Sequence, residues 1–318
     1  MVALRKKLFL SLLATLALNS CGRSGGFSPG SDSALPGAGE VFTSRSLPNA
    51  GNWDGCAFGN GRFVAFGGNS DDTVSSSDGS AWIAGNLPAS ALWRSIAFGN
   101  GRFIAVANGS ATAAASSDGI NWSNVTLSSS SGWAAVQFGG GMFVAVADDG
   151  PTAASSPDGS TWTARTMPST EQWMDISYGN GTFVAVAANT NAAATSTDGI
   201  TWTARTMPSS QYWMESAYGN GTFVAVANVS NVAATSPDGI TWTARAMPAS
   251  AAWSSVVFGG GLFLAVAAGP STIAATSRDG VNWTLRTLPA SAAWGDLAFG
   301  NGRFVGFGYG SAHAFSSP

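Results

Sequence analysis

The pattern of apolar and polar residues repeats along most of the chain. Each copy opens with tryptophan, passes through Phe or Tyr and a pair of small turn residues into a short apolar run, and ends in Ser-x-Asp-Gly-x-x-Trp. The first tryptophan occurs at Trp53, Trp93, Trp133, Trp173, Trp213, Trp253 and Trp294, and the second at Trp82, Trp122, Trp162, Trp202, Trp242 and Trp283. These positions account for all 13 tryptophans. A fixed period of about 40 residues indicates a repeat architecture, because one such unit cannot bury its own apolar face.

The copy that begins at Trp173 illustrates the elements that the pattern predicts. Asn180-Gly181 lies between two apolar runs and predicts a type I′ hairpin turn, in which both central residues need a positive φ. Asp198-Gly199 predicts a second tight turn, and Pro208 ends the pairing because proline has no backbone donor. The predicted strands are residues 173–178, 182–188, 193–196 and 201–207.

Four short antiparallel strands in each of seven copies predict an all-β fold, a seven-bladed β-propeller with four-stranded antiparallel blades over residues 40–318. A β-helix or an open solenoid lacks this two-hairpin pattern. The last copy stops where its Asp-Gly-x-x-Trp segment should follow, and residues 42–48 precede Trp53 as residues 202–208 precede Trp213. We therefore expect the N-terminal strand to complete the last blade and close the ring, which also removes exposed sheet edges.

The first residues have the pattern of an export signal. Arg5, Lys6 and Lys7 precede an apolar stretch, residues 8–18, that is too short to span a bilayer as a helix. The stretch leads to Leu-Asn-Ser-Cys, ending at Cys21, and resembles a bacterial lipoprotein signal. That resemblance implies cleavage after residue 20 and a lipid on Cys21. Residues 21–39 then form a Gly/Ser/Pro-rich tether, and the protein is held in the bacterial cell envelope outside the cytoplasm by its lipid anchor alone. The alternative is an ordinary secretory signal.

Charge and residue counts exclude several function classes. Without its three signal-peptide cations, the chain has 11 of its 14 basic residues against 17 acidic ones and no lysine, so a nucleic-acid partner is not expected. His313 is the single histidine, which excludes multi-histidine metal sites. Cys56 is expected to pack as a small apolar residue. We expect no cofactor, no metal and a monomer.

The Ser-x-Asp-Gly-x-x-Trp segment resembles the Asp-box, or BNR repeat, of sialidase-type propellers, whose usual form has one more residue between Asp and Gly. The motif aspartates are Asp78, Asp118, Asp158, Asp198, Asp238 and Asp279. The resemblance implies a structural turn away from any active centre, and isolated aspartates do not predict calcium binding. A sialidase also needs a triad of converging arginines, but here only Arg94 and Arg278 lie outside repeat-fixed positions, so we expect no catalytic residue.

Two sets of residues depart from the repeat and are candidates for function. In a propeller, the loops between second and third strands and the connections between blades share one face, here called the variable face. Its candidate ligand-binding residues are Tyr212, Gln211, Glu171, Gln172, Asp71, Asp72, Asp148 and Asp149. The candidate channel residues, two positions after the first tryptophan, are Asp175, Glu215 and Asp296.

These candidates lead to two hypotheses. The first is a lipid-anchored scaffold that recognises a protein or a glycan on the variable face. The alternative is a glycan-cleaving hydrolase of sialidase-like architecture with a carboxylate pair at the channel mouth, which requires two carboxyl groups about 5–9.5 Å apart.

Overall fold

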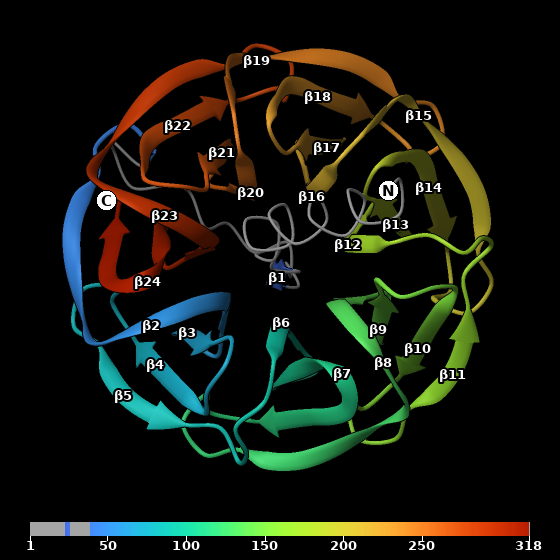
Figure 1. Cartoon of the computed structure of the whole chain (residues 1–318), viewed down its shortest axis with the longest axis horizontal. Helices are drawn as coiled ribbons and strands as arrows, with labels where there is room; N and C mark the ends of the chain where they lie inside the picture. Colours follow the sequence, from blue (N-terminus) through green and yellow to red (C-terminus); the bar gives the residue numbers. More distant parts are fainter. Residues whose placement is uncertain (1–22, 26–38, 318) are drawn as a thin grey trace, which may run out of the picture.

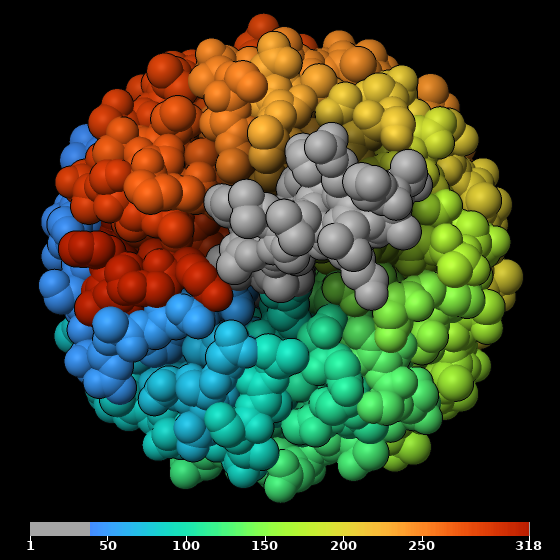
Figure 2. Space-filling view, in the orientation of Figure 1, coloured from blue at the N-terminus to red at the C-terminus, as the bar shows by residue number. Residues whose placement is uncertain are grey.

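The first tryptophan of each repeat lies on the innermost strand of a four-stranded antiparallel sheet. The computed structural model describes residues 23–25 and 39–317, and these sheets are arranged around a central axis as an all-β propeller (Figure 1). The strands that carry these tryptophans are β2 (Thr43–Gly59), β6 (Trp93–Gly99), β8 (Ser123–Gly139), β12 (Trp173–Gly179), β16 (Trp213–Gly219), β20 (Trp253–Gly259) and β23 (Thr284–Gly300). The molecule has a round outline in the same view (Figure 2).

The remaining strands follow outward from the axis. The second strands are β3 (Arg62–Gly67), β7 (Arg102–Ser116), β9 (Met142–Ala147), β13 (Thr182–Ala187), β17 (Thr222–Ala227), β21 (Leu262–Ala267) and β24 (Arg303–Ser316). The third strands are β4 (Asp72–Ser76), β10 (Thr152–Ser156), β14 (Thr190–Ser196), β18 (Ser230–Ser236) and β22 (Ser271–Ser277). The outermost strands are β5 (Ile83–Asn86), β11 (Thr163–Thr166), β15 (Thr203–Gln211) and β19 (Thr243–Ala251).

Five strands are long because each serves two roles. β8 pairs with β7 as far as Gly132 and with β9 from Trp133 onward, so it is outermost in one sheet and innermost in the next. β2 and β23 have the same double role, whereas β7 and β24 contain both the second and the third strand of a blade.

The hairpin turns have the backbone that the sequence predicts. Asn180 and Gly181 have φ values of 48° and 74°, so the predicted type I′ turn is confirmed. The same positive pair occurs at Asn60-Gly61, Asn100-Gly101, Gly140-Gly141, Asn220-Gly221, Gly260-Gly261 and Asn301-Gly302. We call the face that carries these turns the tight-turn face.

Every innermost strand contains a bulge directly after its tryptophan. Trp173 pairs with Ala187 and Asp175 pairs with Val186, so Met174 has no partner in the ladder. The equivalent bulged residues are Asp54, Arg94, Ala134, Met214, Ser254 and Gly295. A bulge re-aims the side chain of the extra residue, so these seven positions are not constrained by strand alternation.

The core lies between adjacent blades. The first tryptophans are all fully buried, each in a cluster with residues of the preceding repeat, as Trp133 is with Ile104 and Val106. Near the axis, the glycine that ends each innermost strand lies against an aromatic ring on the innermost strand of the neighbouring copy. A Cβ atom on Gly99 would overlap Phe138, and one on Gly300 would overlap Phe58. Larger residues therefore cannot occupy these glycine positions without displacing the ring.

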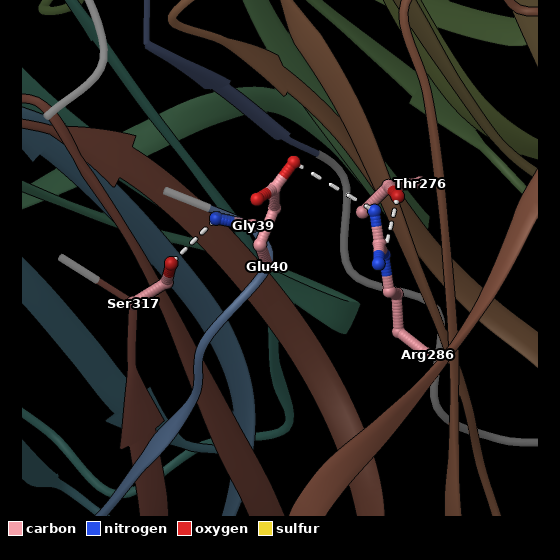
Figure 3. Close-up of polar contacts among 5 residues, drawn as sticks. All are labelled: Gly39, Glu40, Thr276, Arg286 and Ser317. Carbon is pink, nitrogen blue, oxygen red and sulfur yellow. Dashed lines mark hydrogen bonds and ion pairs between the residues drawn. The ribbon is translucent and has the colours of Figure 1, made fainter. Parts of the chain in front are cut away.

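The strands at the two ends of the described chain pair with each other. β2 runs antiparallel to β24, with Thr43 opposite Ser316 and Ser46 opposite His313, so the pairing expected for the N-terminal strand is present. Next to it, the Gly39 N–H donates to Ser317 Oγ at 2.5 Å, and Glu40 Oε1 lies 3.9 Å from the Arg286 guanidinium (Figure 3). These two contacts join residues 278 and 246 positions apart in the sequence.

The N-terminal region contributes one short element to the described chain. β1 (Arg23–Gly25) pairs in parallel with β6 at residues 96–98, and it lies near the centre of Figure 1. Cys21 and the predicted signal, residues 1–20, lie outside the described residues. The described part of the chain contains no helix long and apolar enough to cross a membrane.

Candidate functional site

The six motif aspartates hold tight turns. Asp198 Oδ1 accepts hydrogen bonds from the backbone N–H groups of Ile200 and Thr201, both at 2.8 Å, and from Ser196 Oγ at 2.9 Å. The two backbone donors are the main reason that the pKa of Asp198 lies below its ordinary value. The same bonds recur at Asp78, Asp118, Asp158, Asp238 and Asp279. Within the described ranges, no three His, Cys, Asp or Glu side chains gather as metal ligands.

Other repeat-fixed polar residues on the tight-turn face link neighbouring blades. Asn100 Nδ2 donates to the carbonyl oxygen of Pro157 at 2.9 Å, and Arg102 donates to the carbonyl oxygen of Asp158 at 3.0 Å. Asn301 and Arg303 form the equivalent bonds to the copy that begins at Trp53. These side chains are used by the fold, which explains why Asn recurs at its position in five of the seven copies and Arg at its position in three.

The candidate channel carboxylates are buried between innermost strands. Asp175 and Glu215 have no exposed surface and Asp296 is 1% exposed. Asp175 Oδ2 accepts from the N–H and Oγ of Ser216 at 2.8 and 2.9 Å, and Asp296 Oδ2 accepts from the Cys56 N–H at 2.8 Å. The three carboxylates therefore do not line an open acidic mouth. Asp175 and Asp296 instead face the neighbouring innermost strand, from which each accepts hydrogen bonds.

Cys56 takes part in this arrangement. Its side chain is buried in the core, as expected for a small apolar residue, but its thiol also donates to Asp296 Oδ2 at 3.0 Å. The sequence pattern did not indicate that second role, because the partner is 240 residues away.

The variable-face candidates divide between structural and available groups. Asp149 accepts from the Gly132 N–H and from Ser131 Oγ, both at 2.7 Å, and so fixes its own loop. Asp148 is half-buried and lies 3.3 Å from Asn108 Nδ2. Gln172 is exposed and accepts from Asn189 Nδ2 at 3.4 Å. The half-buried positions are Glu171, Gln211, Asp71 and Asp72.

A charged cluster forms where these loops meet the bulged positions. The positive charge of Arg94 acts to lower the pKa of four side chains that come from different repeats, Asp54, Asp148, Tyr212 and Tyr309. Burial raises the pKa of Asp54 to about 7, an effect that Arg94 opposes and Asp296 reinforces. Burial also raises the pKa of Asp148, with Arg94 again opposing. We call Asp54, Arg94, Asp148, Tyr212 and Tyr309 the mouth cluster.

The mouth cluster has an apolar side. Tyr212 packs against Met174, Ala188 and Met214, and both methionines occupy bulged positions like those of Asp54 and Arg94. Burial raises the pKa of the Tyr212 phenol, which Arg94 opposes and Asp148 reinforces. The site therefore combines a cation, two carboxyl groups and phenol groups with a methionine-lined wall. Such an arrangement can bind a ligand that has both a polar and an apolar part.

Sequence reasoning predicted Tyr212 and Asp148 but missed Asp54, Arg94 and Tyr309. A signal for two of them was present: the residue after the first tryptophan changes from Asp to Arg, Ala, Met, Met, Ser and Gly along the copies. Within the repeats, Arg94 is also one of only two arginines outside repeat-fixed positions. The bulge that re-aims the side chain at this position is visible only in the strand register.

Comparison with known proteins agrees with the architecture. Residues 124–253 match a family model described as the DUF6242 beta propeller domain. No curated protein matched the chain. One similar solved structure is a streptogramin B lyase, with a TM-score of 0.77 and 12% identity over 87% of this chain and 97% of that one. Another is a catalytically inactive virginiamycin B lyase from Staphylococcus aureus with quinupristin, with a TM-score of 0.78 and 12% identity over 87% of this chain and 99% of that one. YCF48 bound to D1 peptide is also similar, with a TM-score of 0.69 and 14% identity over 92% of this chain and 99% of that one. Identities this low show a shared propeller fold alone.

Proposed function

We propose that this protein is a binding scaffold that recognises a protein or glycan ligand on its variable face, at the mouth cluster. The observation that carries the proposal is the convergence on Arg94 of residues that depart from the repeat and come from separate copies. Repeat-fixed residues serve blade packing, so residues that vary and still converge are the best candidates for ligand contact.

The chemistry of the mouth cluster favours one class of ligand. Two carboxyl groups lie in the electrostatic field of a single guanidinium, and tyrosine is among the residues enriched at binding hot spots. A cationic or polyhydroxyl ligand is therefore favoured over an anionic one. YCF48, which has a similar fold, is bound to a peptide in one of the similar structures, and this is compatible with a protein ligand here.

The glycan-cleaving alternative has less support. It depends on an accessible carboxylate pair at the channel, whereas Asp175 and Asp296 accept hydrogen bonds from neighbouring innermost strands and are buried. The similarity to lyase structures concerns the fold and supplies no catalytic residue for this chain.

We further propose that the scaffold is a monomeric seven-bladed ring with Asp-box-like turns. Support comes from the β2–β24 pairing and from the contact of Gly300 with Phe58, which places the last innermost strand against the first. The turn bonds of the motif aspartates support the resemblance to Asp-box repeats. The proposed location is the bacterial cell envelope, with Cys21 as the lipid attachment site.

The test begins with ligand discovery. The full-length protein is applied to a glycan array and used in pull-down experiments, and the affinity of a ligand is then measured for variants. Tyr212→Ala combined with Glu171→Ala should weaken binding at least about tenfold, or about 1.4 kcal/mol. Arg94→Ala should also weaken it, whereas Arg62→Ala, on the tight-turn face, is the matched control. Unchanged affinity in the first two variants, with loss in Arg62→Ala, would place the ligand on the opposite face.

A further inference from the structure

A second candidate site lies at the other end of the axis, and the proposed function does not use it. A cavity of about 760 Å³ is lined by the tight-turn residues and by one aromatic residue from each innermost strand. These aromatic residues are Phe58, Phe98, Phe138, Tyr178, Tyr218, Phe258 and Phe299. All except Phe299 retain partial exposure, although their other contacts are with core phenylalanines such as Phe143, 4.7 Å from Phe138 between ring centroids. The volume is within the usual range for a small-molecule site.

Gln137 supplies an unsatisfied acceptor in the wall of this cavity. Its side chain lines the cavity and is 4% exposed, in a position that is Ala57, Ala97 or Ala217 in other copies. Its Nε2 donates to the carbonyl oxygen of Phe138 at 2.8 Å, and its Oε1 has no hydrogen-bond partner. Because a carbonyl oxygen can only accept, this bond assigns the nitrogen and leaves the oxygen as the group that needs a donor. A buried acceptor without a donor costs stability, so its presence points to a ligand.

Besides Gln137, the cavity is lined by polar groups at its tight turns, Asn100, Asn180 and Asn220, and by the phenol groups of Tyr178 and Tyr218. Asn100 and Asn220 donate to carbonyl oxygens of neighbouring copies, so these amides are already used by the fold.

Beyond Gln137, Ser177 and Ser216 line the same wall, and their Oγ atoms are 2.8 Å apart. Ser216 Oγ also donates a hydrogen bond to Asp175 Oδ2 at 2.9 Å. Both hydroxyl groups therefore already have hydrogen-bond partners within the protein. Ala57, Val257 and Leu297 line the cavity without adding polar groups.

We propose that this cavity binds an aromatic molecule with a single N–H or O–H donor, such as an indole or a phenol. Its ring contacts the aromatic side chains, where aromatic pairs add to the energy of burial. Its donor bonds to Gln137 Oε1. A polyhydroxyl ligand fits less well, because most of the side chains that line the cavity are aromatic or aliphatic and cannot replace the water around many hydroxyl groups.

The experiment compares indole with 1-methylindole, which has the same ring system but no donor, by titration calorimetry on the full-length protein. Indole is expected to bind about tenfold more tightly, the effect of one buried hydrogen bond. Gln137→Ala should remove this preference, and it is expected to fold because other copies have alanine there. Ala217→Val, which reproduces the residue at Val257, is the matched control: it reduces the space without touching the acceptor and should preserve the preference.

Two results would overturn the inference: no binding of indole, or an equal preference for indole in the native protein and in Gln137→Ala. Neither result bears on the variable face, because that proposal is tested with another ligand and with Arg94→Ala.

Discussion

At the residue scale, Asp54 shows how position changes the chemistry of a side chain. The motif aspartates accept backbone hydrogen bonds near solvent, and the pKa of Asp78 falls to about 2. Asp54 occupies a bulge and is 5% exposed, so burial raises its pKa to about 7. The pKa of an aspartate therefore falls at one site and rises at the other. Hydrogen-bond donors stabilise the charged form of Asp78, whereas burial removes the water that would stabilise the charged form of Asp54.

This difference predicts how stability depends on pH. Between about pH 4 and pH 7 the folded protein keeps a proton on Asp54 that the unfolded chain has lost, so stability falls as pH rises through this window. The upper limit is about 4 kcal/mol, at about 1.4 kcal/mol per pKa unit. The motif aspartates affect stability only at lower pH than this window. The stability that a lowered pKa contributes is lost as pH falls from about 4 towards 2.

Urea denaturation at several pH values measures the effect. Asp54→Asn should flatten the decline between pH 4 and 7 relative to the native protein, since an amide does not titrate. Parallel curves for the two proteins would contradict the assignment to Asp54.

A second residue-scale prediction concerns backbone strain at Val229. This residue has a φ of 52° and is 78% exposed, whereas the equivalent residue one repeat earlier is Asn189, with a φ of 58°. The left-handed region costs an L-residue about 1–2 kcal/mol, and asparagine tolerates it better than a β-branched residue. Val229→Asn is therefore expected to stabilise the protein by about 1 kcal/mol in thermal denaturation. Val281→Asn, at an exposed valine without positive φ, should give no comparable gain.

At the element scale, the pairing of β2 with β24 connects the two ends of the described fold. Phe42 precedes β2 and packs edge-on against Phe315, with ring centroids 5.2 Å apart. Trp294 also contacts Phe315, so an aromatic cluster links the N-terminal strand to the last copy. The outermost position of that sheet is filled by residues from the opposite end of the chain.

Deletion of residues 40–48 should therefore expose the edge of β24 and lower the thermal stability of the protein. Phe42→Ala alone should cost about 2–3 kcal/mol, less than the 3–5 kcal/mol of a fully buried phenylalanine. Val41→Ala is the control, because Val41 is 59% exposed. Equal stability of the native and deleted proteins would show that the strand does not support the ring.

At the scale of the whole molecule, attachment to the membrane is expected to depend on one residue. Cys21→Ala should prevent lipid attachment and move the protein from the membrane fraction to the soluble fraction. Fractionation followed by detergent-free washing measures this. A variant that remains membrane-bound would show that the lipoprotein interpretation is wrong.

The two ends of the axis differ in character across the whole molecule. The tight-turn face repeats the same turn geometry, and its Asn and Arg side chains bond to neighbouring copies where they occur. The variable face brings unlike residues such as Arg94, Asp148 and Tyr212 under one electrostatic field. A repeat protein can change its loops without disturbing blade packing, so function is expected where the copies diverge.

The sequence by itself determined the propeller architecture, the hairpin turns and the pairing of the first strand with the last copy. These features repeat or depend on local backbone preference, as with Asn180-Gly181, and periodic patterns reveal them. Only the tertiary structure decided the sites. The hydrogen bonds that bury Asp175 come from the next repeat. The bulge that re-aims Arg94 and the unsatisfied Oε1 of Gln137 depend on strand register and side-chain packing, which the apolar pattern does not specify. A contact between residues of two copies leaves no signal in the local sequence. Each residue fits the apolar pattern of its own strand, and the distance between the two is fixed only when the blades pack together.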